Sequence, residues 1–174
     1  MKRAEPAAKT SSRGRDLGVP RARVYYQGRG GLVLDHVERQ LESLVGKYEA
    51  PDIIIIHCGT NDLVSKPTGD MVRSARAIVN YIRITMLHCV AMWSHILPRL
   101  KYDGANDQRA IELKRQLVNR KLSAYVKKPN GIWHRQFTQK SVNLISQDKV
   151  HLTSKGEAVL LSNWATALFE VMDL

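Results

Sequence analysis

The hydrophobic pattern of the chain is organised around four consecutive isoleucines, Ile53–Ile56. A short β-branched run bounded by polar and turn residues, here Asp52 and Gly59, predicts a strand that is buried on both faces of a parallel sheet. Ligands of open α/β sheets bind at the carboxyl edge of such strands. We therefore expect the functional site near Asn61 and Asp62, which follow the strand.

Strand-like and helical periods alternate along the rest of the chain. Further strands are expected at 23–27, 89–93 and 132–134, and helices at about 32–48, 71–87, 107–128 and from 153 or 154 to about 169. The apolar helical faces that we expect to be buried are Leu34, Val37, Leu41, Leu44, Val45 and Tyr48; Met71, Ala75, Ile78, Ile82 and Met86; Ile111, Leu117, Leu122, Tyr125 and Val126; and Val159, Leu160, Trp164, Leu168 and Phe169. This alternation predicts an α/β protein, a three-layer α/β/α sandwich with a parallel sheet.

Residues 1–22 show neither period and are rich in Lys, Arg, Ala, Ser, Gly and Pro. They predict a basic mobile tail, in which 17–19 is the segment able to dock. A chain of 174 residues suits a single domain, which we place at 23–174.

The net charge of +11 is concentrated in two segments. Residues 1–31 hold eight lysines and arginines against two acidic residues, and residues 101–135 hold nine against three. This excess permits the basic tail and the basic helix to contact nucleic acid or another anionic surface. Solvated faces that keep the protein soluble are the alternative, because no aromatic stripe interleaves the charges.

Two cysteines, Cys58 and Cys89, are too few for a disulfide framework or a metal knuckle and predict reduced, buried thiols. No run approaches the 18 apolar residues expected of a membrane span, and the basic N-terminus lacks the apolar middle of a secretory signal. We expect no membrane insertion, no metal site and an intracellular protein, cytoplasmic or nuclear.

Three turns carry the candidate chemistry, and the predicted topology places them near one edge. The amide of Gly31, in a glycine-rich turn, and the side-chain amide of Asn61 are donors of the kind that form an oxyanion hole for acyl transfer. Asp148 and His151 are three residues apart before the last helix, so the carboxylate can orient the imidazole as a general base. Alternatively, Asn61 holds a turn and Asp148 caps the final helix.

These residues resemble the motifs of the SGNH (GDSL-like) hydrolase superfamily over residues 23–172. Three segments carry the resemblance in order: His-Cys-Gly-Thr-Asn-Asp-Leu at 57–63, Trp-Ser-His-Ile-Leu-Pro-Arg at 93–99 and Asp-Lys-Val-His-Leu at 148–152. They look most like SGNH-like domains of animal genomes, some of them linked to mobile elements. The resemblance implies a flavodoxin-like sheet, no cofactor, and small-molecule ester substrates.

The resemblance also implies a role for each candidate residue. His151 would be the base, Asp148 its orienting acid, and the Gly31 amide and the Asn61 side chain the oxyanion donors. The nucleophile that it implies is a serine in a Gly-Asp-Ser block at the end of the first strand, and residues 1–22 hold neither the block nor the strand.

No other residue replaces that serine convincingly. Ser11 and Ser12 follow no apolar run that could form a strand and elbow. Cys58 and Ser94 lie at strand positions where a packed side chain is the simpler interpretation. The histidines that flank strands are expected to be partly buried and hydrogen-bonded: His57, His88, His95 and His134.

The sequence thus predicts an SGNH-type ester hydrolase domain whose first strand is missing, from a truncated gene model or a degenerate copy. Built for Ser-His-Asp chemistry, it is expected to be inactive because it lacks a nucleophile. The rival hypothesis is a non-catalytic binding module derived from a hydrolase, which holds an acyl or carbohydrate ligand or a nucleic acid. A second rival is an unstable remnant without function.

Overall fold

The computed structural model describes residues 4–127 and 130–173. They divide into two compact units, each of which we describe by itself. The first unit holds residues 4–30, 97–102 and 132–173, and the second holds residues 31–96, 103–127 and 130–131.

A three-stranded sheet is built from β1 (Ile53–Ile56), β2 (Val90–Ser94) and β3 (Gly131–Ile132), in the order β1-β2-β3. β1 and β2 run parallel, with Ile53 opposite Val90 and Ile56 opposite Trp93. The strands predicted at the isoleucine run, at 89–93 and at 132–134 are confirmed, although β3 is only two residues long and begins at Gly131. The burial predicted for the isoleucine run holds only for Ile56, because Ile53–Ile55 are half-buried. Within the described part of the chain, no strand pairs with the other edge of β1.

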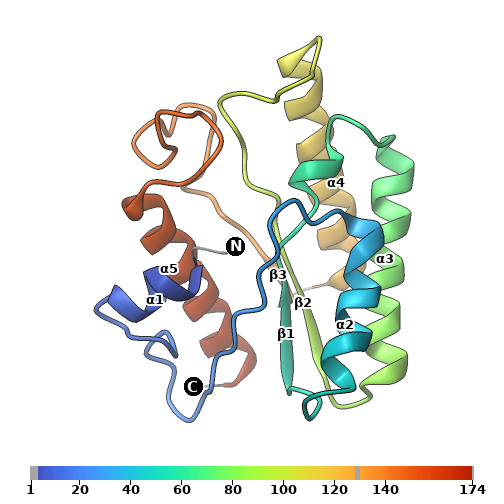
Figure 1. Ribbon diagram of the computed structural model, residues 1–174, viewed down its shortest axis with the longest axis vertical. Coiled ribbons are helices and arrows are strands. Elements are labelled where there is room, and N and C mark those ends of the chain that lie inside the picture. Colours follow the sequence, from blue (N-terminus) through green and yellow to red (C-terminus); the bar gives the residue numbers. More distant parts are fainter. Residues whose placement is uncertain (1–3, 128–129, 174) are drawn as a thin grey trace. The chain divides into compact units, whose positions relative to one another are not determined.

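The second unit contains most of the helices: η1 (Leu34–His36), α2 (Val37–Val45), η2 (Thr60–Asp62), α3 (Thr68–Thr85) and α4 (Gln108–Val126). α3 packs against α2, α4 and β2 (Figure 1). Its predicted apolar face is confirmed, because Met71, Ala75, Ile78, Ile82 and Met86 are all buried. The mixed α/β class predicted from the sequence is therefore confirmed.

The helix predicted at 32–48 is shorter than expected. Leu34 and Val37 are buried as predicted, but α2 ends at Val45. Val45 and Tyr48 are exposed, so the prediction of a buried face to Tyr48 is wrong.

The buried face of α4 differs from its prediction. Leu122 and Val126 are buried as expected, whereas Ile111, Leu117 and Tyr125 are only half-buried. The buried stripe runs instead through polar side chains and one valine: Glu112, Arg115, Val118 and Asn119.

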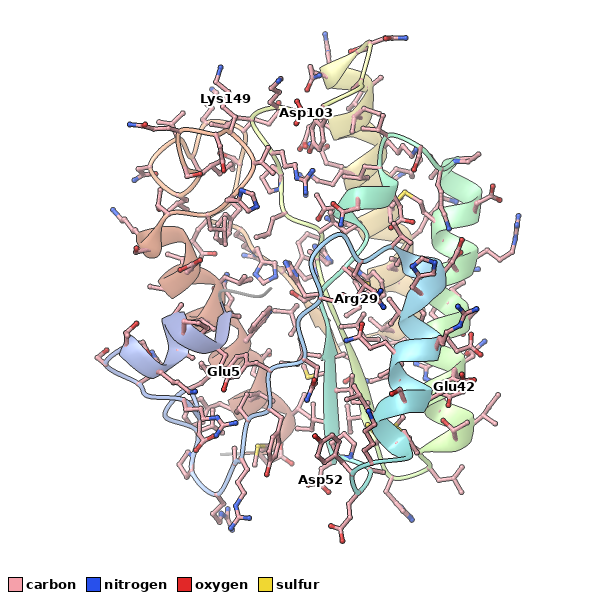
Figure 2. The ribbon with its side chains drawn as sticks, in the orientation of Figure 1. Glu5, Arg29, Glu42, Asp52, Asp103 and Lys149 are labelled. Atoms are coloured by element: carbon pink, nitrogen blue, oxygen red, sulfur yellow. The ribbon has the colours of Figure 1, made fainter. Side chains whose placement is uncertain are left out.

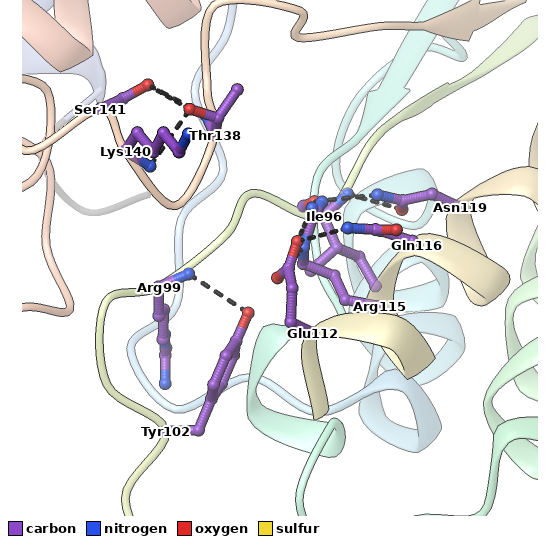
Figure 3. Close-up of polar contacts among 10 residues, drawn as sticks. All are labelled: Ile96, Arg99, Tyr102, Glu112, Arg115, Gln116, Asn119, Thr138, Lys140 and Ser141. Atoms are coloured by element: carbon purple, nitrogen blue, oxygen red, sulfur yellow. Dashed lines mark hydrogen bonds and ion pairs between the residues drawn. The ribbon is translucent and has the colours of Figure 1, made fainter. Parts of the chain in front are cut away.

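The reason is a cluster of polar contacts around the backbone of Ile96 (Figure 3). Arg115 donates from Nη1 to the Ile96 carbonyl at 2.7 Å and forms a two-pronged ion pair with Glu112, with Nε–Oε2 at 2.8 Å and Nη2–Oε1 at 2.5 Å. Asn119 accepts from the Ile96 N–H at 2.9 Å and donates to its carbonyl at 3.0 Å. Because each buried charge has its partners, α4 can turn these residues inward, where they hold it against the segment after β2.

The first unit is organised around α5 (Ser154–Val171), which packs against α1 (Ala4–Thr10). Leu160, Trp164 and Leu168 of α5 are buried as predicted, while Val159 and Phe169 are half-buried. In the described part of the chain, no helix is both long and apolar enough to cross a membrane.

α1 lies in the segment in which we expected no regular structure, so that expectation is wrong for Ala4–Thr10. The helix is seven residues long and buries only Ala4 and Ala8, too few positions to give a period in the sequence. Leu17 and Val19 are buried, as the docking prediction required. The division of the chain at residue 22 stays a prediction.

The strand predicted at 23–27 is also wrong. Burial alternates along this segment, as in an extended chain, but it forms no ladder. Val24 N donates instead to Asp16 Oδ1 at 2.8 Å, and the Tyr26 hydroxyl donates to the Arg15 carbonyl at 2.9 Å. Period-2 side chains are not sufficient for a strand when the backbone bonds to a loop instead of a neighbouring strand.

Candidate functional site

The predicted acid–base pair lies in a tight loop just before α5. An isolated antiparallel bridge between Ile145 and Leu152 closes the loop, and Ser146 N donates to the His151 carbonyl at 2.7 Å. Lys149 at the tip has a φ of 63°, in the left-handed region (Figure 2). This turn brings residues 148 and 151 to the same side.

Asp148 and His151 are in direct contact, with Asp148 Oδ2 at 2.6 Å from His151 Nδ1. The other carboxylate oxygen accepts three hydrogen bonds, from the Ser146 hydroxyl at 2.5 Å and from the backbone N–H groups of Val150 and His151 at 2.9 Å each. These donors, led by the Ser146 hydroxyl, lower the pKa of Asp148 well below its usual range. The predicted pairing of Asp148 with His151 is therefore present in the structure.

This geometry suits a general base. A carboxylate that accepts from Nδ1–H fixes the tautomer in which Nε2 can take a proton. The His151 side chain is 59% exposed, so water and small molecules can reach the ring. The role of Asp148 as a helix cap, left open by the sequence, falls to Thr153, whose hydroxyl accepts from Gly156 N at 3.1 Å.

Gly156 and Thr153 fix this loop to the beginning of α5. Thr153 N donates to the Leu144 carbonyl at 3.1 Å, and a Cβ built on Gly156 would lie 2.1 Å from the same Leu144 oxygen. Only a residue without a side chain permits that approach. The loop that carries Asp148 and His151 is thus held by backbone contacts at its base.

Ser146 contacts the candidate pair, and the sequence analysis did not single it out. It lies two residues before Asp148, at a spacing typical of local hydroxyl–carboxylate contacts in turns, and this was the available signal.

The predicted oxyanion donors lie together in the second unit. Gly31 has a φ of 69° in the turn before η1, and Asn61 lies in η2, just after β1. Asn61 Nδ2 donates to the Leu32 carbonyl at 3.0 Å, which links the two turns. One amide hydrogen of Asn61 is therefore engaged with the backbone, and the side chain is exposed.

The buried carboxylate of Asp62 links the turn after β1 to the start of η1. Its side chain is fully buried and accepts from Leu34 N, at 3.1 Å and 3.3 Å to its two oxygens. Burial raises the pKa of Asp62, although Lys66, at 3.6 Å, acts in the opposite direction. Its buried N–H contact at the start of η1 identifies Asp62 as structural.

Gly31 and Asn61 belong to one unit, whereas Asp148 and His151 belong to the other. The structure brings each pair together within its own unit. That the two pairs serve one site stays a prediction.

The alternative nucleophiles are poorly suited to attack. Ser11 donates to the Ala8 carbonyl at 2.8 Å at the end of α1, and Ser12 is exposed in the following turn. Burial raises the pKa of the Cys58 thiol far above its ordinary value, which disfavours the thiolate. Ser94 has no exposed surface and is 2.8 Å from His57 Nδ1.

The other histidines have structural surroundings. Burial lowers the pKa of His57 and of His95 to about 4, and His95 Nε2 contacts the Ser123 hydroxyl. His134 is buried, lies 3.0 Å from Asn163 Nδ2 and packs edge-on against Phe137. The expectation of burial is wrong for His88, which is exposed. Among residues 4–127 and 130–173, no three His, Cys, Asp or Glu side chains are placed to hold a metal ion.

Comparison with known proteins gives matches to solved structures alone. No family model and no curated protein matches the chain. A candidate acylhydrolase from Bacteroides fragilis shares 17% identity with a TM-score of 0.70, over 83% of this chain and 74% of that one. A GDSL-like lipase from Bacteroides thetaiotaomicron shares 18% with a TM-score of 0.67, over 83% and 75%. A carbohydrate esterase of family 3 from Talaromyces cellulolyticus shares 17% with a TM-score of 0.64, over 88% and 77%.

Proposed function

Because the chain has the fold of GDSL- and SGNH-type acylhydrolases and esterases, we propose that it carries the acid–base and oxyanion components of an ester hydrolase site without a serine nucleophile. His151 is the proton acceptor, Asp148 the group that orients it, and Asn61 and the Gly31 amide the donors to a developing oxyanion. The observation that carries the proposal is the 2.6 Å contact between Asp148 Oδ2 and His151 Nδ1.

On this proposal the chain by itself assists hydrolysis of activated esters only weakly. Without a hydroxyl to activate, His151 can promote attack by water, and loss of the nucleophile removes most of the rate of a serine hydrolase. The substrates expected are small acyl esters, because several of the solved structures with this fold are acylhydrolases or esterases by name.

The test is hydrolysis of p-nitrophenyl acetate together with labelling by a fluorophosphonate probe, which reacts with activated serines. We expect slow hydrolysis that falls at least fivefold in His151→Ala, and no labelled serine. His88→Ala is the matched control, because His88 is an exposed histidine outside the candidate site. An equal loss of hydrolysis in His151→Ala and His88→Ala would show that His151 has no specific role. A labelled serine would show that the chain does contain an activated nucleophile.

A double-mutant comparison tests whether the two pairs act on one substrate. If Asn61 and His151 serve the same reaction, Asn61→Ala should lower the residual rate of the parent chain but add little to His151→Ala. If the effects of Asn61→Ala and His151→Ala on the rate multiply independently, the two residues do not serve the same reaction.

A further inference from the structure

α3 presents a row of cationic and polar side chains to solvent. Arg73, Arg76, Asn80 and Arg83 recur at intervals of three or four residues, and all four are exposed. The opposite side of the same helix is its buried apolar face. α3 therefore shows a polar stripe on the side that faces away from its own unit's core.

The neighbouring helix α4 holds two of these arginines on one aromatic ring. The Arg76 guanidinium carbon lies 4.8 Å from the centroid of the Tyr125 ring, and that of Arg83 lies 5.3 Å from it. The Tyr125 hydroxyl donates to Asn80 Oδ1. Stacking on a ring restrains a guanidinium but leaves its N–H edge available for bidentate bonds to an oxyanion.

Lys121 is exposed one turn before Tyr125 on α4, and α4 packs against α3 (Figure 1), so we group it with the two arginines. We call Arg76, Arg83 and Lys121 the basic seam. Arg76 and Arg83 are seven residues apart, which places them about 10 Å apart along the axis of α3.

The charge of the basic seam is not neutralised within the described residues. The acidic residue of α3, Asp70, pairs with Arg73 at 2.9 Å, and that of α4, Glu112, is buried with Arg115. No described acidic side chain forms an ion pair with any of the three cations of the seam. An uncompensated row of this kind attracts a polyanion.

We infer that the basic seam binds the phosphate backbone of a nucleic acid. Guanidiniums restrained in a row match a ligand that repeats phosphates along a line. An anionic membrane fits less well, because surface helices that bind lipid insert an apolar face, and α3 buries its own. Ile84 and Leu87 are exposed, but they lie beyond the end of the row.

The binding mode is contact with phosphates and not with bases. The Tyr125 ring is half-buried and already contacts two guanidiniums, which disfavours the stacking of a base on it. Affinity should therefore depend strongly on salt and weakly on base sequence. This inference stands apart from the hydrolase site and does not rest on it.

The experiment is fluorescence anisotropy of the full chain with a labelled single-stranded RNA of mixed sequence, with duplex DNA of the same length, and with anionic vesicles, each at several salt concentrations. The test variant is Arg76→Ala/Arg83→Ala/Lys121→Ala. The control is Arg39→Ala/Lys47→Ala/Lys155→Ala, which removes the same charge from exposed positions elsewhere.

For the seam variant we expect at least a tenfold rise in Kd for RNA and a salt slope shallower by about 2, three phosphate contacts at about 0.7 each. The control should change Kd less than threefold. DNA binding with the same seam dependence also supports the inference and shows that the ribose is not recognised. Equal losses in both variants, no binding by the parent chain, or seam-dependent binding to vesicles without RNA binding would each overturn it. Circular dichroism of both variants confirms that α3 and α4 remain folded.

Discussion

Removal of the Glu112 carboxylate is expected to destabilise the protein severely. The ion pair with Arg115 is almost sealed from water, since the Glu112 and Arg115 side chains are 8% and 11% exposed. In Glu112→Ala the guanidinium keeps its 2.7 Å bond to the Ile96 carbonyl but loses two charge-assisted bonds and its counter-charge. Breaking a buried pair in this way typically costs about 3–5 kcal/mol.

For a chain of this length each kcal/mol corresponds to about 2–4 °C, so the midpoint of thermal unfolding should fall by roughly 6–20 °C. Urea unfolding followed by tryptophan fluorescence measures the free energy directly. Glu42→Ala is the matched control, because Glu42 is an exposed glutamate on α2 (Figure 2), and its loss should stay within about 0.5 kcal/mol.

A double variant separates the charge from the packing. Glu112→Met/Arg115→Met replaces both charges by apolar side chains of similar length and should recover most of the lost stability. A cost below about 1 kcal/mol for Glu112→Ala, or a double variant worse than both single variants combined, would show that the pair does not hold α4 as the contacts indicate.

Three further predictions follow from other contacts. Gly156→Ala should lower the free energy of unfolding by about 1–3 kcal/mol, because the new methyl group collides with the Leu144 carbonyl. The control is Gly69→Ala, which should be neutral or stabilising because the space around its Cβ is open; urea unfolding compares the two variants. Burial lowers the pKa of His95 to about 4, so between pH 6.5 and 4 the native state binds fewer protons than the unfolded state. As the pH drops through this window, His95 should therefore lower the free energy of unfolding by about 2–3 kcal/mol. His95→Gln should reduce the pH dependence measured by urea unfolding but not abolish it, because burial also lowers the pKa of His57 to about 4; an unchanged curve would contradict the assignment. Ser146→Ala removes the leading hydrogen bond to Asp148, so the pKa of that carboxyl, measured by carbon NMR, should rise toward its ordinary value.

The elements predictable from the sequence are those in which apolar residues repeat over a long window. α3 shows this clearly, because its five predicted core positions are all buried. The acid–base pair was also predictable, since a contact between residues 148 and 151 requires only a local turn. Short-range spacing and long apolar periods are both visible in one dimension.

The rest depends on partners that lie far away along the chain. Arg115 turns inward because the Ile96 carbonyl, 19 residues earlier, accepts from it, and any periodicity counts this arginine as exposed. The segment 23–27 has the side chains of a strand, but a strand also requires a neighbour for its backbone, which side chains do not specify.

β1 has a strand neighbour on one side only among the described residues, and this has a measurable consequence within its four isoleucines. Backbone groups of a parallel strand alternate in direction, and the Asp52 carbonyl accepts from Val90 N at 2.7 Å, so Ile54 and Ile56 also face β2, whereas Ile53 and Ile55 face away. In deuterated solvent the amides of Ile54 and Ile56 should retain their hydrogens long after those of Ile53 and Ile55 have exchanged. A polypeptide that paired with this side of β1 would be detected residue by residue, as slowed exchange at Ile53 and Ile55 alone.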